Sequence, residues 1–190
     1  MIRSSNIVIA AAFGIGGLVA PLVTSAWLVD RGAVLATKPR PVWTEVQWPF
    51  PMDQWGKGKA FQCKAADCGT VVNIYLRAKI GFCNCTSGVA DDEELERLSD
   101  FDLTGGPIAA LGDGRPITVA WMKGRSRSYE ISGSARGGKS ALLAAFNDGC
   151  DAIVTSAVLD HHRLAEIEPH VIEFLNGKIV LQWAKVTLGL

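Results

Sequence analysis

The chain has 190 residues, which is enough for one domain of ordinary size with a short appendage and too few for two full α/β domains. Its 19 Lys and Arg residues balance 19 Asp and Glu residues, so the basic excess that binds a phosphate backbone is missing and nucleic acid is excluded as the leading partner. Hydrophobic residues make up 48% of the chain, which excludes the disordered and collagen classes.

The first predicted element is an apolar segment near the N-terminus. Ile7–Val29 carries no charged side chain and would span about 34 Å as a helix, which matches a hydrocarbon core of about 30 Å. The sequence therefore predicts a single transmembrane helix within residues 1–29. A cleavable signal peptide is the alternative, since residues 24–26 form an acceptable cleavage site before Trp27. We expect an uncleaved anchor, because the apolar run is longer than that of a signal peptide and continues past this site.

One face of this predicted helix carries small residues. Ala12, Gly16 and Ala20 are spaced four apart, a pattern that lets a second transmembrane helix approach closely. Small residues are also common in membrane spans in general. The pattern favours helix packing against another membrane subunit.

Two sequence features disagree about the side of the membrane on which the rest of the chain lies. Arg3 precedes the apolar segment, whereas Arg31, Lys38 and Arg40 follow it, which favours a cytoplasmic C-terminal part. The crowding of cysteines favours an oxidising compartment. We expect export, and therefore a single-pass protein of the inner membrane with its C-terminal domain in the periplasm.

Residues 30–59 are rich in Pro and Trp and show no sustained period, which predicts an extended juxtamembrane connector. The rings of Trp27, Trp43, Trp48 and Trp55 are interface candidates, because amphipathic aromatic side chains are favoured in the headgroup zone of a membrane. The alternative is that these rings fold back onto the core of the domain. Both interpretations stay open from the sequence.

Residues 60–190 are predicted to form one α+β domain with a mainly antiparallel sheet. Alternating apolar residues predict strands, and acidic residues gathered in a first turn predict a helix. The predicted elements are a half-buried strand at Thr70–Phe82, a helix at Asp91–Ser99, a hairpin of Ile117–Lys123 and Ser128–Ser132 around Gly124–Arg127, a helix at Gly138–Asn147, a buried strand at Ala152–Leu159, and a final helix after Asn176–Gly177.

Four of the five cysteines crowd together and are candidates for structural disulfides: Cys63, Cys68, Cys83 and Cys85. We expect bridges that join Cys63 or Cys68 to Cys83 or Cys85, with Cys150 left as a thiol. A zinc site is an alternative, although a Cys-x-Cys pair is tighter than the usual zinc spacing. Redox-active thiols are a further alternative, but the chain contains no Cys-x-x-Cys motif.

The stretch from Gly133 to Ser140 matches the G-x-x-x-x-G-K-S phosphate-loop pattern, with Gly138 and Lys139 at the other fixed positions. In such a loop the backbone amides cradle phosphates at a helix N-terminus. The preceding residues are polar, unlike a central parallel strand, and too few residues follow for most of a doubly wound sheet. We expect a glycine-rich turn that caps a helix.

A second group of polar residues could supply metal ligands but has no diagnostic spacing, and we expect it to be a solvated loop. Its members are Asp160, His161, His162, Glu166, Glu168 and His170. The acidic run from Asp91 is expected to be a solvated helix face. No paired nucleophile and base specifies catalysis. We therefore expect no catalytic residue, no resident metal and no cofactor.

These observations favour a non-catalytic accessory or interaction protein, anchored in the membrane and facing the periplasm, with other membrane or envelope subunits as partners. The alternative is an exported thiol-redox or metal-handling protein that uses the cysteine cluster. A third hypothesis is a membrane-associated nucleotide-binding protein.

Overall fold

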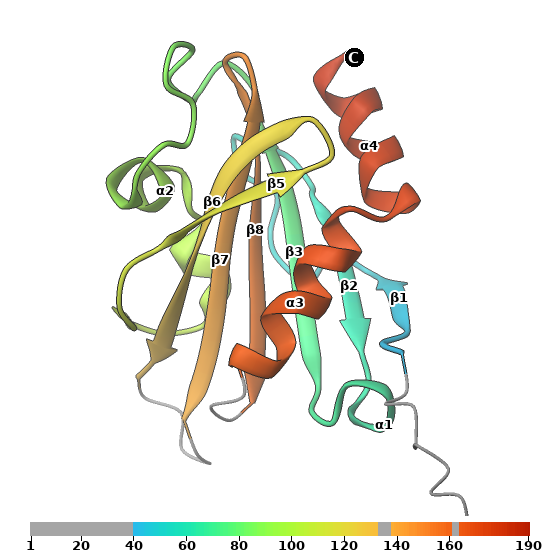
Figure 1. The fold of residues 1–190 in the computed structure, drawn as a ribbon. Coiled ribbons are helices and arrows are strands. Elements are labelled where there is room, and N and C mark those ends of the chain that lie inside the picture. The colour runs from blue at the N-terminus through green and yellow to red at the C-terminus, as the bar shows by residue number, and fades with distance from the viewer. Residues whose placement is uncertain (1–39, 133–137, 161–163) are drawn as a thin grey trace, which may run out of the picture. The chain divides into compact units, whose positions relative to one another are not determined.

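The structure is a computed structural model that describes residues 40–132, 138–160 and 164–190, and Lys38–Leu190 form one compact unit. The elements in chain order are β1 (Trp43–Val46), β2 (Lys59–Cys63), α1 (Ala65–Cys68), β3 (Val72–Lys79), α2 (Asp92–Leu98), the 3-10 helix η1 (Phe101–Thr104), β4 (Ile108–Ala110), β5 (Arg115–Val119), β6 (Met122–Ile131), β7 (Lys139–Asp148), β8 (Asp151–Asp160), α3 (Leu164–Leu175) and α4 (Lys178–Leu188) (Figure 1). The expected α+β class with an antiparallel sheet is confirmed.

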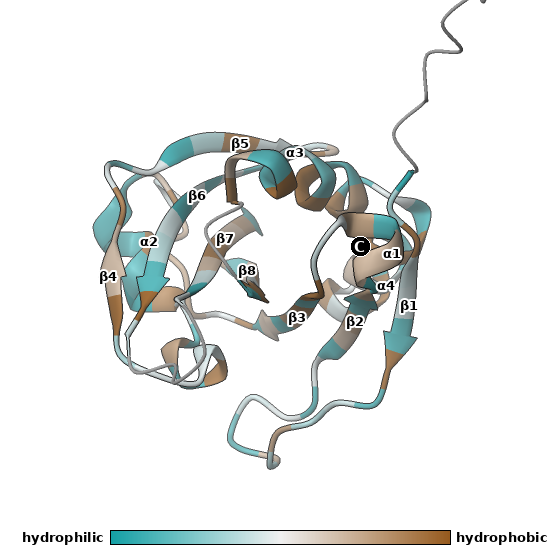
Figure 2. Ribbon diagram, turned by 90° about the horizontal axis from the view of Figure 1, so that it is seen from below, coloured by the Kyte–Doolittle hydropathy of each residue, from teal (hydrophilic) through white to brown (hydrophobic). Residues whose placement is uncertain are grey.

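All eight strands belong to one sheet, in the order β1-β2-β3-β8-β7-β6-β4, and every assigned pair is antiparallel. β5 pairs with the first half of β6, and β4 pairs with its last residues. The sheet curves toward the side on which α3 and α4 lie (Figure 2). β3, β8 and β7 lie at its centre, which places β1 at a free edge.

The domain has three layers because both faces of the central strands are apolar. On one face, Leu76 and Phe146 belong to the same core cluster as Val171 of α3 and Val180 of α4. On the other face, Ala145 and Val154 pack with the buried leucines of α2, Leu95 and Leu98. Successive residues of a strand point to opposite faces, so Ala145 and Phe146 contribute to different layers.

Two predicted helices are confirmed, and their boundaries have a local cause. The Asp91 side chain accepts a hydrogen bond of 2.8 Å from the Glu94 amide, which caps α2. α4 begins directly after Gly177 and buries Val180 and Ala184 on one face.

The helix predicted at Gly138–Asn147 is wrong, because Lys139–Asp148 is the central strand β7. Residues 141–146 are buried without a gap, as expected for a strand that is covered on both faces. A short apolar run of this kind has no period that separates a strand from a helix.

The predicted hairpin exists, but its turn lies elsewhere. Val119 pairs with Met122, so the chain turns at Ala120, whose φ is 52°, and Trp121. Gly124–Arg127 lie within β6. Strand β6 passes very close to β7 at Gly124, where a Cβ atom would meet the Ala145 carbonyl oxygen, so only glycine fits there.

The expected loop after β8 is also corrected, since α3 occupies Leu164–Leu175. Part of the expected connector belongs to the domain, because β1 pairs with β2. Among the residues that the structure describes, no helix is long and apolar enough to cross a membrane. The predicted anchor lies outside those residues, as do its positions Ala12, Gly16, Ala20 and Trp27.

Candidate functional site

The five cysteines lie at two opposite ends of β3. Cys63 is bonded to Cys68 near the start of β3, and Cys85 is bonded to Cys150 beyond its end. Cys83 is a buried free thiol. The expected bridges from the first pair to the second are therefore wrong, and Cys150 is not the remaining thiol.

The length of β3 explains the correction. Its eight residues separate Cys68 from Cys83 by about 26 Å, far more than the Cα separation that a disulfide allows. Cys68, the last residue of the short helix α1, is instead bonded to Cys63, the last residue of β2. At the other end, β8 is antiparallel to β3, so Lys79 pairs with Ala152 and Cys150 lies beside the end of β3.

Cys83, Cys85 and Cys150 form the candidate site, which we call the three-cysteine site. The Cys83 amide donates a hydrogen bond of 3.1 Å to the Cys150 carbonyl. The Cys83 thiol donates to the Gly149 carbonyl, with 3.3 Å between Sγ and oxygen. The Cα atoms of Cys85 and Cys150 lie 4.2 Å apart. Cys150 thus has one bonded and one unbonded cysteine as neighbours.

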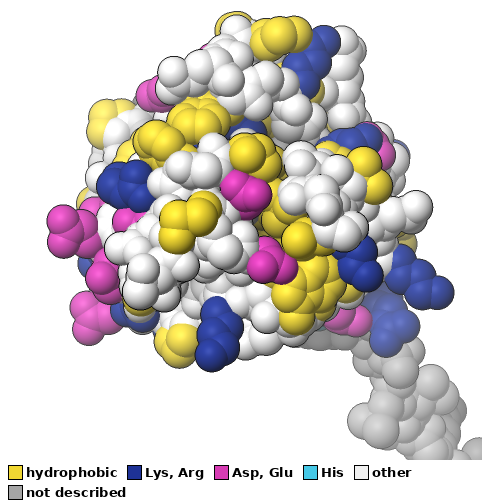
Figure 3. Space-filling view, turned by 90° about the horizontal axis from the view of Figure 1, so that it is seen from above, with side chains coloured by type: hydrophobic (Ala, Val, Ile, Leu, Met, Phe, Trp, Pro, Cys, Tyr) yellow, Lys and Arg dark blue, Asp and Glu magenta, His cyan; other side chains and the backbone are white. Residues whose placement is uncertain are grey.

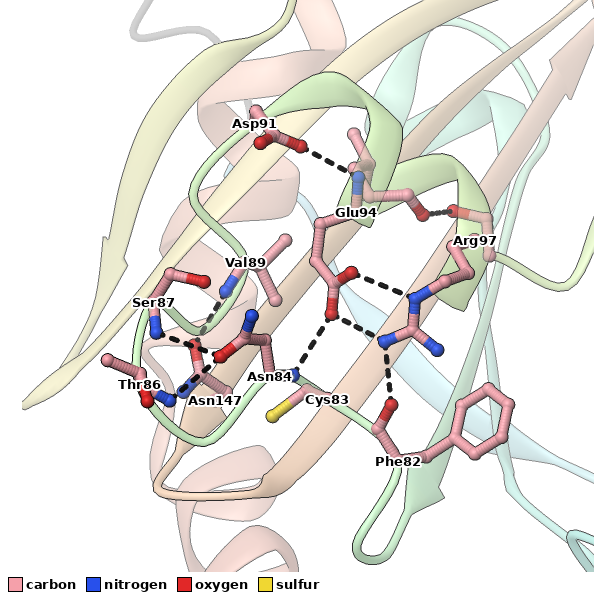
Figure 4. A network of polar contacts seen from close by, with 12 residues as sticks. Phe82, Cys83, Asn84, Thr86, Ser87, Val89, Asp91, Glu94, Arg97 and Asn147 are labelled. Atoms are coloured by element: carbon pink, nitrogen blue, oxygen red, sulfur yellow. Dashed lines mark hydrogen bonds and ion pairs between the residues drawn. The ribbon is translucent and has the colours of Figure 1, made fainter.

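The loop that holds Cys83 and Cys85 is fixed from two sides (Figure 4). From α2, Glu94 accepts a hydrogen bond of 3.1 Å from the Asn84 amide, and Arg97 donates to the Phe82 carbonyl at 2.7 Å. From β7, Asn147 accepts a hydrogen bond of 3.1 Å from the Val89 amide. The Asn84 side chain closes the turn by accepting hydrogen bonds from the amides of the second and third residues after it. The backbone on both sides of the two cysteines is therefore anchored.

The charges around Cys83 make its thiol a poor nucleophile in the resting state. Burial raises the pKa of the Cys83 thiol above its usual range, and the carboxylates of Glu94 and Asp151 raise it further, against an opposing effect of Arg97. A thiol reacts through its thiolate. At neutral pH Cys83 therefore stays protonated.

We expect Glu94 to contribute to the acid sensitivity of the domain. Hydrogen bonds from Arg97 hold the pKa of the Glu94 carboxyl below its usual value of 4.5. A carboxyl with a lowered pKa stabilises the fold at higher pH, and this stabilisation is lost as the pH falls through its folded-state pKa. Glu94→Gln should lower the free energy of unfolding at pH 7 by on the order of 1 kcal/mol. The difference from the unchanged chain should shrink at pH 3.

Urea unfolding at both pH values measures this effect. Glu93→Gln is the matched control, since Glu93 is exposed on the same turn of α2. An equal loss of stability for the Glu94 variant at pH 7 and pH 3 would show that the carboxylate charge has no part in it.

A second buried polar cluster lies on β3, away from the cysteines. Arg77 and Lys79 are only 3% and 5% exposed. Lys79 pairs with Asp100 at 2.8 Å, and Arg77 pairs with Asp53 at 2.5 Å. The sequence predicted a half-buried strand here, because alternation shows which face a residue is on but not what covers that face.

Aromatic side chains from the expected connector supply this cover. The Trp48 ring lies 5.1 Å from the Arg77 guanidinium, and the Trp55 ring lies 5.1 Å from the Lys79 ammonium. Trp43 packs at 5.0 Å on the Phe174 ring of α3. These three tryptophans therefore pack on the domain itself, in agreement with the fold-back interpretation.

An open groove lies between α4 and the first three strands. It has a volume of about 330 Å³, and its floor includes Phe61 and Leu76, with Trp183 and Val186 on the α4 side. Val186 is 78% exposed. The end of the domain seen in Figure 3 also exposes hydrophobic side chains between acidic and basic ones, so neither charge sign dominates there.

The remaining predicted sites are not assembled in the part of the chain that the structure describes, which leaves out His161 and His162. Lys139 and Ser140 lie in strand β7, so no helix N-terminus follows Gly138 and the phosphate-loop interpretation is wrong; Gly133 lies outside the described residues. Among the described residues, no group of three or more His, Cys, Asp and Glu side chains could hold a metal ion. Glu168 instead pairs with Arg115 and accepts a hydrogen bond from Ser126.

No protein-family model matches the chain, and no curated protein matches it. The proposed function therefore rests on the residues of the site and the surfaces around it.

Proposed function

We propose that the chain is an exported accessory protein, held at the membrane by its N-terminal apolar segment, whose domain binds a membrane-anchored partner subunit without catalysis. The observation that supports an extracytoplasmic location is the pair of disulfides, Cys63–Cys68 and Cys85–Cys150. Disulfides form and persist in oxidising compartments and are rare in the cytosol. They support an extracytoplasmic domain.

The buried polar side chains support a structural role for the interior. Arg77 pairs with Asp53 and fastens the segment before β2 to the sheet, whereas Lys79 pairs with Asp100 and fastens the link between α2 and η1 to it. On the same face, Arg127 of β6 pairs with Glu96 of α2 at 2.7 Å. Each pair joins two elements, and none places a nucleophile beside a base.

The surface proposed for the partner is the groove beside α4. Its lining is mainly apolar, and β1 at its rim is the edge strand of the sheet within the described residues, a position at which a further strand can pair. The Glu45 and Lys59 side chains at this rim pair with each other at 2.5 Å, so they present little net charge. These features suit an extended, uncharged peptide segment that pairs with β1 and places apolar side chains in the groove.

The length of the chain before β1 argues for a membrane-anchored partner. The apolar segment ends at Val29, and the thirteen residues 30–42 reach at most about 45 Å before β1 begins at Trp43. If the segment is an anchor, the start of β1 stays within that distance of the membrane surface. A partner fixed in the same membrane then meets the groove at a high effective concentration.

Copurification from membranes in mild detergent tests this function, with the full chain as bait. We expect one membrane protein to copurify with the unchanged chain and to be lost with Val186→Glu, which places a charge in the groove. Leu111→Glu is the matched control, because Leu111 is exposed at 47% and does not line the groove. Equal recovery with both variants would reject the groove as the contact surface, and recovery of no membrane protein would reject the accessory role.

A further inference from the structure

We propose that Cys83, Cys85 and Cys150 form a thiol–disulfide exchange site, in which the bond of Cys150 moves from Cys85 to Cys83 and leaves Cys85 as an exposed thiol that reacts with external thiols and disulfides. The inference goes beyond the accessory role, since it assigns a covalent chemistry to the domain. It rests on the positions of three cysteines that the chain brings together from two distant segments.

The backbone places Cys83 within reach of Cys150. The Cys83 amide donates a hydrogen bond of 3.1 Å to the Cys150 carbonyl. With standard N–Cα, Cα–C and C=O bond lengths, this contact holds the two Cα atoms no more than about 7 Å apart. Disulfides join Cα atoms about 4.4 to 6.8 Å apart, so side-chain rotation with a small shift of the backbone brings Cys83 into bonding reach of Cys150.

The thiol of Cys83 already points to the segment that carries Cys150. Its Sγ atom lies 3.3 Å from the carbonyl oxygen of Gly149, the residue before Cys150. The loop around Asn84 is held by Glu94 of α2 and by Asn147 of β7 (Figure 4), and Cys83 and Cys85 are the residues on either side of Asn84. Exchange therefore requires no rearrangement of the sheet.

The step is balanced and needs no external oxidant. Cys83 loses its proton to water, and its thiolate attacks Sγ of Cys150. The Cys83–Cys150 bond forms, the Cys85–Cys150 bond breaks, and the electron pair leaves on Cys85, which takes up a proton from water. One disulfide and one thiol are present before and after the step.

The two isomers differ in what they expose. In the resting isomer the free thiol is Cys83, which is 6% exposed. After the step the free thiol is Cys85, which lies in an exposed turn. The negative charges of Glu94 and Asp151 beside Cys83 disfavour its thiolate and so slow the exchange at neutral pH. An exposed Cys85 can form a mixed disulfide with another molecule.

Thiol counting on the full chain, purified in detergent without reductant and then denatured, tests the exchange. The unchanged chain should show one thiol, at Cys83. Cys85→Ser should show none, because Cys83 takes over the bond to Cys150. Cys83→Ser should also show none, because the original bond remains. Two thiols in the Cys85 variant, at Cys83 and Cys150, would overturn the proposal.

A second measurement needs no substitution and so does not depend on the folding of a variant. The native chain is incubated with oxidised glutathione at pH 9, where Cys83 is more often ionised, quenched with acid and mapped by mass spectrometry. We expect glutathione on Cys85 together with a Cys83–Cys150 bond. Glutathione on Cys83 with Cys85–Cys150 intact, or no adduct at all, would show that the bond does not move.

Discussion

Replacing Cys150 by Ser is expected to lower the free energy of unfolding by about 4 kcal/mol. Cys150 is bonded to Cys85 across a sequence separation of 65 residues, and loss of a link across so long a loop restores much conformational freedom to the unfolded chain. The substitution also removes the only cysteine to which Cys83 is adjacent through the backbone hydrogen bond described above. Urea unfolding of the oxidised full chain measures the effect.

Cys63→Ser is the matched comparison, since it opens a loop with a sequence separation of only 5 residues. The same loop-entropy relation gives about 2 kcal/mol for that bond. Cys83→Ser breaks no disulfide and should change stability least of the three. A larger loss for the Cys63 variant than for the Cys150 variant would contradict the assigned pairing.

Asp100→Asn is expected to lower the free energy of unfolding by about 3 kcal/mol, as for other buried ion pairs that lose one partner. The Asp100 side chain is 10% exposed, pairs with Lys79 at 2.8 Å and lies 3.6 Å from the Arg77 guanidinium. Asn keeps the shape but removes the charge that faces these two buried cations. Denaturant unfolding at pH 7 measures the loss.

Asp102→Asn is the control for this substitution. Asp102 is exposed and lies two residues away in η1, which begins directly after Asp100, so its replacement should change stability by less than about 0.5 kcal/mol. A change of similar size for both variants would mean that burial of the β3 cations does not depend on Asp100.

The elements that were predicted correctly are those whose pattern has one interpretation. Strand β3 alternates, β8 is apolar and bounded by Asp residues, and α2 carries its acids in the first turn. Each of these signals comes from neighbouring residues, so it can be read without knowing the fold.

Strand β7 and helix α3 were missed because their patterns have two interpretations. The apolar run of β7 fits a buried strand or a buried helix. In α3 the spacing of Leu164, Ile167, Val171 and Leu175 marks one helical face, although the helix contains Pro169, a residue that usually interrupts helices. Tertiary packing on the sheet decides both cases.

The three-cysteine site depends on strand pairing, which neighbouring residues do not reveal. Both β3 and β8 were predicted as strands, and antiparallel pairing of the two would have placed Cys150 beside Cys83. The sequence did not reveal that these two strands pair with each other. The burial of Arg77 and Lys79 was missed for a similar reason, since the segment that covers them precedes β2 and was interpreted as a connector.

The central claim is that the domain folds in an oxidising compartment with two disulfides, one local and one that joins the ends of β3 and β8. Alkylation of the chain in intact cell envelopes, before denaturation and digestion, tests it most directly. We predict peptides linked through Cys63–Cys68 and Cys85–Cys150. Cys83 should stay unlabelled in the intact envelopes and should react only with reagent added after denaturation. Label on all five cysteines would contradict both the pairing and the exported location.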